Sequence, residues 1–196
     1  MRRFIRAACA AVGLISLTQA AHAQALGPQR QFLAIEPYYE STTFDLGQGV
    51  AKEAVNGYGG RLWINLDPFH FIPNGSIALY TSYAPSQGSA TAAFNGITTL
   101  HYGAEYDQYF VRRPLGGIID PFLTVGGGRI RFNDRGAKDS YWTLTPGGGL
   151  RLPFPNRFEV RGDVKDLMIF NTPSGTAGAK RTTHNLLIQA GLGLTF

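Results

Sequence analysis

Apolar and polar residues alternate at every second position through most of the chain beyond residue 30. The alternation is clearest in residues 186–196, where the even positions carry only Leu, Ile, Ala and Phe. Residues 158–170 repeat it, with four charged residues at odd positions. Period-two alternation is typical of β-strands with one apolar face. We therefore expect eight strands, separated by turns rich in Gly and Pro: residues 32–41, 57–67, 76–84, 98–110, 119–132, 141–152, 158–170 and 184–196.

The lengths of these strands and of their connections favour a barrel that crosses a membrane. Most strands reach the ~9–11 residues that a tilted strand needs to cross a bilayer, whereas soluble strands are most often ~5–6 residues long. Short turns containing proline follow the second, fourth and sixth strands. Such alternation of short turns and longer loops places both chain ends at the short-turn end. The longer, polar loops are expected at residues 42–56, 85–97, 133–140 and 171–183.

The charged face of these strands predicts a paired network inside a narrow lumen. A soluble, lipocalin-like barrel would instead bury its apolar face and expose the charges to water. The charges are balanced in sign and concentrated, and pairing in a lumen would offset the cost of removing them from water. The expected lumen charge network is Glu36, Arg61, Glu105, Asp107, Arg129, Arg131, Arg151, Glu159, Arg161, Asp163 and Lys165.

Aromatic residues near the strand ends predict two girdles at the membrane surfaces. The phase of residues 119–132 is ambiguous, because residues 126–128 are all glycine and a bulge there would exchange the two faces. The outer girdle is expected to hold Tyr58, Tyr83, Phe132, Trp142 and Phe170, and the inner one Phe110, Phe122, Phe154, Phe158 and Phe196.

The first 23 residues have the pattern of a secretory signal peptide. A basic start is followed by an apolar run, and Ala21-His22-Ala23 supplies an A-x-A cleavage site. The expected mature domain is therefore 24–196, and the single cysteine, Cys9, lies in the segment that is removed. The formal net charge of +5 shrinks with it, since 15 basic against 13 acidic residues remain without Arg2, Arg3 and Arg6. Neither this balance nor any basic cluster interleaved with aromatics favours a nucleic-acid partner.

These features together resemble the small outer-membrane β-barrel superfamily that includes the OmpA transmembrane domain and OmpX. The resemblance rests on the signal peptide, the eight amphipathic strands, the glycine-rich segments 121–129 and 145–152, and the terminal aromatic residue. It implies an all-β, eight-stranded, antiparallel, up-and-down transmembrane barrel in the bacterial outer membrane after export. Its partners would be outer-membrane lipid, lipopolysaccharide and, during biogenesis, the barrel assembly machinery. The assembly signal implied is the last strand with Leu192, Leu194 and Phe196.

No catalytic, cofactor-binding or metal-binding residues are predicted. The glycine triplets at 126–128 and 147–149 are not followed by the Lys-Ser/Thr of a phosphate loop. Some eight-stranded barrels are lipid A deacylases that use a His and a nearby Ser on the lipid face. Here His101 is expected inside, and Gly103 occupies the next position on its face. Lys180 and Arg181 in the last loop are candidates to contact lipopolysaccharide phosphates.

The sequence therefore favours a non-enzymatic outer-membrane protein for membrane integrity or surface interaction. Eight strands leave an interior that side chains can fill, which favours a charged plug over an open pore. A narrow porin for small solutes, a lipid A-modifying enzyme and a soluble ligand-binding barrel stay open as alternatives. The oligomeric state is open as well.

Overall fold

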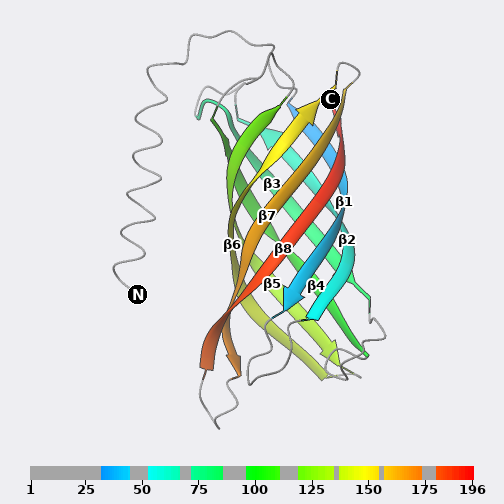
Figure 1. The fold of residues 1–196 in the computed structure, drawn as a ribbon, viewed down its shortest axis with the longest axis vertical. Coiled ribbons are helices and arrows are strands. Elements are labelled where there is room, and N and C mark those ends of the chain that lie inside the picture. Colours follow the sequence, from blue (N-terminus) through cyan, green and yellow to red (C-terminus); the bar gives the residue numbers. More distant parts are fainter. Residues whose placement is uncertain are drawn as a thin grey trace, which may run out of the picture.

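The computed structural model is a closed barrel of eight antiparallel strands, and it describes residues 32–44, 53–66, 72–85, 96–110, 119–134, 137–154, 157–173 and 180–196. Each strand pairs with the next in sequence, and β8 closes the barrel on β1 (Figure 1). The predicted all-β, up-and-down fold is thus confirmed. The strands are β1 (Leu33–Phe44), β2 (Glu53–Asn65), β3 (Gly75–Ala84), β4 (Ile97–Tyr109), β5 (Asp120–Asp134), β6 (Ala137–Pro153), β7 (Phe158–Pro173) and β8 (Lys180–Thr195).

The C-terminal residue lies at the end of the barrel where β1 begins (Figure 1). Backbone hydrogen bonds join Phe196 and Leu33 in both directions, with donor–acceptor distances of 2.8 and 3.4 Å. Strands β2, β4 and β6 also end here, so we call this the turn end and the opposite end the loop end. Among the described residues, none lies in a helix that is long and apolar enough to span a membrane. The predicted signal peptide, with Ala21 and Ala23, lies outside the described residues.

The strands run further at the loop end than the alternation predicts. β5 and β6 stay paired out to Asp134 and Ala137, and β7 and β8 out to Pro173 and Lys180. The expected long loops at 133–140 and 171–183 were therefore wrong in large part, because most of their residues are strand. Backbone pairing does not require an apolar face, so a hairpin with polar side chains on both faces continues past the point where the alternation fades.

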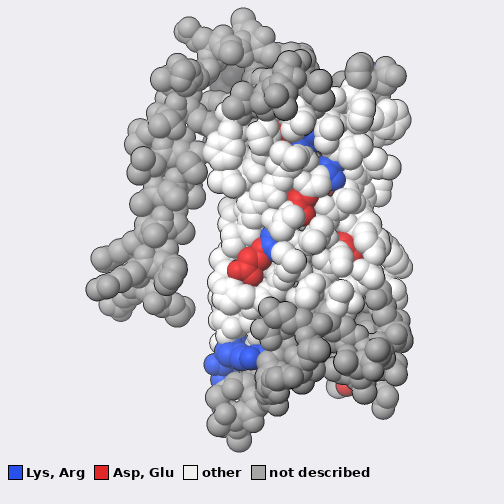
Figure 2. All heavy atoms as spheres, in the orientation of Figure 1, with Lys and Arg blue, Asp and Glu red and all other residues white. Residues whose placement is uncertain are grey.

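The two faces of the wall have opposite character. The odd positions of β7 and β8 point inward and are buried, whereas the even positions point outward. Outward side chains are mainly apolar, and Figure 2 shows a mostly white wall that is crossed by one diagonal row of charged residues. This is the arrangement of a membrane barrel and the reverse of a soluble one. Among the outward-facing side chains are Ile35, Leu62, Leu79, Leu123, Val125, Leu150, Val164, Ile188, Leu192 and Leu194.

The predicted girdles are only partly outside. Tyr58, Trp142 and Phe158 are more than half exposed on the outer wall, at 61%, 58% and 57%. Phe122 and Phe132 point inward instead, which corrects their assignment to the girdles. Phe122 is 2% exposed, and Phe132 packs at the edge of a buried apolar cluster.

Candidate functional site: the filled lumen

The lumen holds most of the charges that the sequence assigned to it. Among the residues that the structure describes, seven acidic and four basic side chains are buried there. Two of the acids, Glu40 and Asp120, were missed, although the alternation within β1 and β5 could have identified them. The nine residues that the structure places inside as predicted are Glu36, Arg61, Glu105, Asp107, Arg151, Glu159, Arg161, Asp163 and Lys165.

Arg129 and Arg131 lie outside, and their assignment to the lumen was wrong. β5 alternates without a bulge through its glycine triplet, so that Thr124 and Ile130 point inward. Arg129 is exposed and places its guanidinium 4.5 Å from the ring centre of Trp142 on the outer wall. Near the loop end the lumen is apolar and holds Ile130, which places the neighbouring residues Arg129 and Arg131 on the outward face.

Two arginines form the centre of the charge network. Arg61 Nη1 donates to Glu36 Oε1 at 2.7 Å, and Arg61 Nε lies 3.1 Å from Glu105 Oε1. Arg161 Nε donates to Asp163 Oδ2 at 3.0 Å, and its Nη1 donates to Asp107. The two arginines also share carboxylates, since Asp163 Oδ2 lies 3.3 Å from Arg61 Nη2. Four strands are thus cross-linked by ion pairs and charge-assisted hydrogen bonds inside the barrel.

Further partners extend this network. Lys165 Nζ donates to Glu105 Oε2 at 2.5 Å, and Trp63 Nε1 donates to Glu36 Oε2 at 2.8 Å. Gln189 on β8 accepts a hydrogen bond from Arg61 and donates one to Glu40 Oε2 on β1 at 3.0 Å. Glu36 thus accepts from two donors, whereas one carboxylate oxygen of each of Glu105, Asp107 and Asp163 has no hydrogen-bond partner. The ion pairs with Arg61, Arg161 and Lys165 offset part of the cost of burying these charges.

Aromatic rings fill the space that the charges leave. The Arg161 guanidinium lies 4.3 Å from the ring centre of Trp63 and 4.0 Å from that of Phe122. The Arg61 guanidinium lies 4.3 Å from the ring centre of Tyr38. Such stacking stabilises a cation that is removed from water. It also explains why Phe122 is inside the barrel and not in the girdle.

A second ion-pair group closes the turn end. Arg151 Nη2 donates to Asp120 Oδ2 at 2.7 Å, and its Nη1 donates to Glu159 Oε2 at 3.2 Å. The Arg151 guanidinium lies 4.7 Å from the ring centre of Tyr109. Tyr109 in turn packs against Phe122, with ring centres 5.3 Å apart. The two ion-pair groups are therefore joined by a continuous layer of side chains.

His101 lies inside, as predicted. Its Nε2 is 3.1 Å from both Tyr80 Oη and Thr143 Oγ1. The Tyr80 side chain lies along the inner wall over Gly103 and Gly128 on the next two strands, where an added Cβ would come within 2.8 Å of its hydroxyl.

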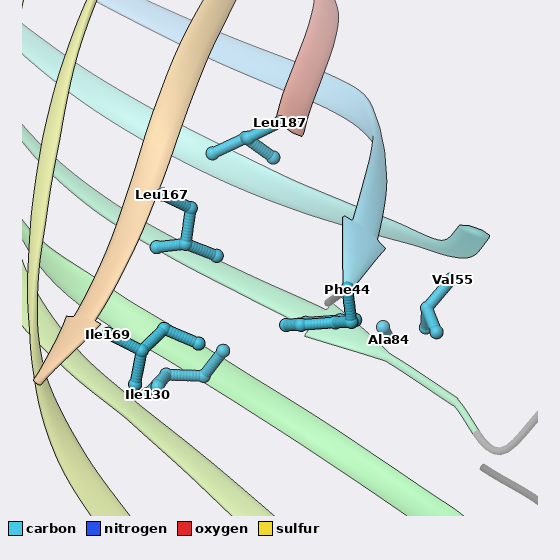
Figure 3. Close-up of a cluster of buried hydrophobic side chains, with 7 residues drawn as sticks. All are labelled: Phe44, Val55, Ala84, Ile130, Leu167, Ile169 and Leu187. Carbon is cyan, nitrogen blue, oxygen red and sulfur yellow. The ribbon is translucent and has the colours of Figure 1, made fainter. Parts of the chain in front are cut away.

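An apolar cluster fills the lumen at the loop end, and the sequence did not predict it. Its seven buried side chains come from six strands and point toward one another across the barrel (Figure 3). Single apolar residues at inward positions, such as Leu187, were read as exceptions on a polar face, whereas the fold collects them at one level. The cluster consists of Phe44, Val55, Ala84, Ile130, Leu167, Ile169 and Leu187.

In the part of the chain that the structure describes, no group of three His, Cys, Asp or Glu side chains is arranged to hold a metal ion. The lumen groups are instead bound to one another. These side chains therefore fill the lumen and cross-link the strands of the barrel.

No family model matches the sequence, and no curated protein matches it. Solved structures do match. The N-terminal β-barrel domain of Pseudomonas aeruginosa OprF aligns with a TM-score of 0.55 at 12% identity, over 86% of this chain and 100% of that one. The chain has the fold of the small outer-membrane β-barrels.

Two more outer-membrane barrels are similar at the same level. Neisserial surface protein A (NspA) aligns with a TM-score of 0.53 at 12% identity, over 87% of this chain and 100% of that one. The attachment invasion locus protein Ail of Yersinia pestis aligns with a TM-score of 0.50 at 14% identity, over 86% and 100%. The resemblance to the small outer-membrane barrels is thereby confirmed at the level of the fold.

Proposed function

We propose that this protein is a non-conducting, non-enzymatic barrel of the bacterial outer membrane that supports membrane integrity or surface interaction. The observation that carries the proposal is the filled lumen. Ion pairs occupy its middle and turn end, and an apolar cluster occupies its loop end. An ion entering from outside would have to displace the apolar cluster and then exchange with bound carboxylates.

The membrane location is tested first. The protein should be found in the outer-membrane fraction and should migrate differently on SDS gels when unboiled, because a closed barrel resists SDS until it is heated. A soluble periplasmic protein without this shift would contradict the location. It would leave the soluble ligand-binding barrel as the better hypothesis.

Conductance separates the proposal from a narrow porin. Purified barrels in planar bilayers should give no steady ion-sized currents at neutral pH. One observation favours a narrow porin: among the described residues, the seven buried acids outnumber the four buried bases. A pore with this lining would prefer cations, so steady cation-selective currents would overturn the proposal. The enzyme alternative predicts a changed lipid A mass spectrum on overexpression, and we expect none.

Cations around the loop end provide a surface for lipopolysaccharide. Arg131 faces outward two positions from Arg129, and Lys138 is its diagonal neighbour on β6. Residues in such positions lie within ~7–8 Å of each other, so three cations can reach the phosphates of one headgroup. Lys180 and Arg181, at the start of β8, belong to the same end.

Changing Arg129, Arg131 and Lys138 together to serine should reduce the lipopolysaccharide that co-purifies with the barrel. Each cation near an anionic surface contributes roughly 1 kcal/mol, so the loss should exceed tenfold. Native mass spectrometry at increasing salt measures it. Arg157→Asn at the turn end is the control, because asparagine tolerates the positive φ of 65° found there. Equal retention by the triple variant and the control would remove this surface from the proposal.

A further inference from the structure

The wall between β6 and β7 is interrupted. Leu144 pairs with Met168 and Gly147 pairs with Lys165, but Thr145 and Pro146 lack partners on β7. The register is the same on both sides, so the interruption is not a bulge. Proline has no N–H to donate to a ladder.

This break opens a cavity of about 320 Å³ in the outer wall, which we call the notch. Pro146, Val164 and Leu186 line it from the outward face, and Gly147 and Lys165 from the inward one. The notch is a shallow depression that is open to the outside. Its volume lies at the lower end of the range for ligand pockets.

An acid–histidine pair lies at the notch. Asp166 and His184 line it, and His184 Nδ1 lies 2.7 Å from Asp166 Oδ2. Both side chains face outward and are well exposed, at 60% for His184 and 42% for Asp166. On β7 the neighbouring outward residues are Val164 and Met168, so the carboxylate is set in an apolar wall. Ionisable side chains at such positions are costly and generally mark a functional site.

The hydrogen bonding of the pair defines the ligand. A carboxylate only accepts, so His184 Nδ1 must be the donor. In the neutral imidazole Nε2 is then an acceptor, and Asp166 Oδ1 is another. A ligand that satisfies both must bring at least two N–H or O–H donors. An acidic group also favours positive charge, and a primary ammonium meets both requirements.

We propose that the notch binds one lipid whose headgroup carries a primary ammonium. The ammonium donates to Asp166 Oδ1 and His184 Nε2, and the first part of an acyl chain lies over Pro146, Val164 and Leu186. The apolar outward positions of β8 extend from Leu186 to Leu194, so His184 lies just beyond the apolar band, at headgroup level. This inference rests on the proposed location in the outer membrane.

A second proline makes a matched comparison. Pro37 on β1 interrupts pairing with β8 in the same way, since Glu36 and Pro37 lack partners there. The outward residues around it are Ile35, Tyr39 and Leu192, none of them charged. A lipid held by the break alone would bind at both prolines, whereas a lipid held by the acid–histidine pair binds only at Pro146.

Native mass spectrometry of the detergent-purified barrel tests the proposal, with dioleoyl phosphatidylethanolamine and dioleoyl phosphatidylcholine as probes. These lipids share their acyl chains and net charge, but the choline headgroup has no N–H. We expect one ethanolamine lipid per barrel, retained at a concentration at least about tenfold lower than the choline lipid, because the choline headgroup can form neither of the two charge-assisted hydrogen bonds. Asp166→Asn and His184→Leu should each remove this preference, and Pro146→Val should reduce retention. Pro37→Val and Thr182→Val, an outward neighbour on β8, should change neither.

Equal retention of the two lipids by wild type, or a preference that survives in Asp166→Asn, would overturn the inference. A dimer in place of the lipid adduct would also overturn it and assign the notch to a second copy of the chain. The gel shift on heating is recorded for every variant. A wild-type barrel that shifts but does not discriminate contradicts only the notch, whereas the absence of a shift contradicts the proposed function itself.

Discussion

Replacing Arg161 with alanine is expected to lower the free energy of unfolding by about 3–5 kcal/mol. The side chain is among the most deeply buried in the barrel, at 1% exposed. It bonds to Asp107 and Asp163 and lies between the rings of Trp63 and Phe122. Its removal leaves two carboxylates inside the lumen without their main cation, and a cavity between two rings.

Denaturant titration of the barrel in lipid micelles, followed by the gel shift, measures this change. Arg129→Ala is the matched control, because Arg129 is an outward arginine over a tryptophan, and it should cost less than ~1 kcal/mol. Arg161→Met keeps most of the volume and should still be strongly destabilised, whereas adding Asp107→Asn should recover part of the loss. A stability for Arg161→Ala within ~1 kcal/mol of wild type would contradict a structural role for the network.

Gly103→Ala is expected to destabilise the barrel by about 1–3 kcal/mol, although it adds a single methyl group. A Cβ at this position would lie 2.7 Å from Gly128 Cα and 2.8 Å from Tyr80 Oη, and closer still to the Gly127 carbonyl oxygen. Two of these contacts are backbone atoms of the neighbouring strand. The strands would have to separate, and the Tyr80 ring would have to leave His101.

Gly127→Ala provides the control, because Gly127 is the neighbour of Gly128, which pairs with Gly103. A Cβ there points outward and would meet nothing closer than 3.9 Å, at the Thr143 carbonyl oxygen. This variant should be neutral or slightly stabilised, because alanine restricts the unfolded chain more than glycine does. The two unfolding midpoints distinguish the faces of β4 and β5 directly. Similar destabilisation by both variants would contradict the phase that the structure assigns to β5.

Strand number, order and direction were predictable because they depend on local patterns. The alternation in residues 158–170 and 184–196 places charged and apolar side chains on opposite faces whatever the rest of the chain does. The charges of β7 then follow from its phase, and Arg161, Asp163 and Lys165 point inward as expected. Strand ends at the loop end were less accurate, because polar hairpins carry no alternation.

The phase of β5 was not predictable in the same way. The three glycines have no side chain that would show which face of β5 points inward. Phe122 fits a girdle as well as the lumen, and Arg129 fits the lumen as well as the membrane surface. The structure decides through neighbours on other strands. The Phe122 ring packs against the Arg161 guanidinium, and Ile130 packs in the cluster with Leu167 and Ile169. Arg129 and Arg131 therefore point outward. None of these partners is close in sequence.

By itself the sequence determined the class of this protein, because period two and strand length are properties of one segment at a time. It also predicted that the charged side chains of the strands face the lumen, which holds for most of them but not for Arg129 and Arg131. Only the tertiary structure decided how far along the barrel axis each inward residue lies, and which residues of other strands are its neighbours there. Closing a barrel staggers its strands, and this stagger brings apolar residues from six strands to the loop end and an acid–histidine pair to the break at Pro146. Residues that far apart in the chain become neighbours only when the register of every strand pair is set, and no single segment encodes that register.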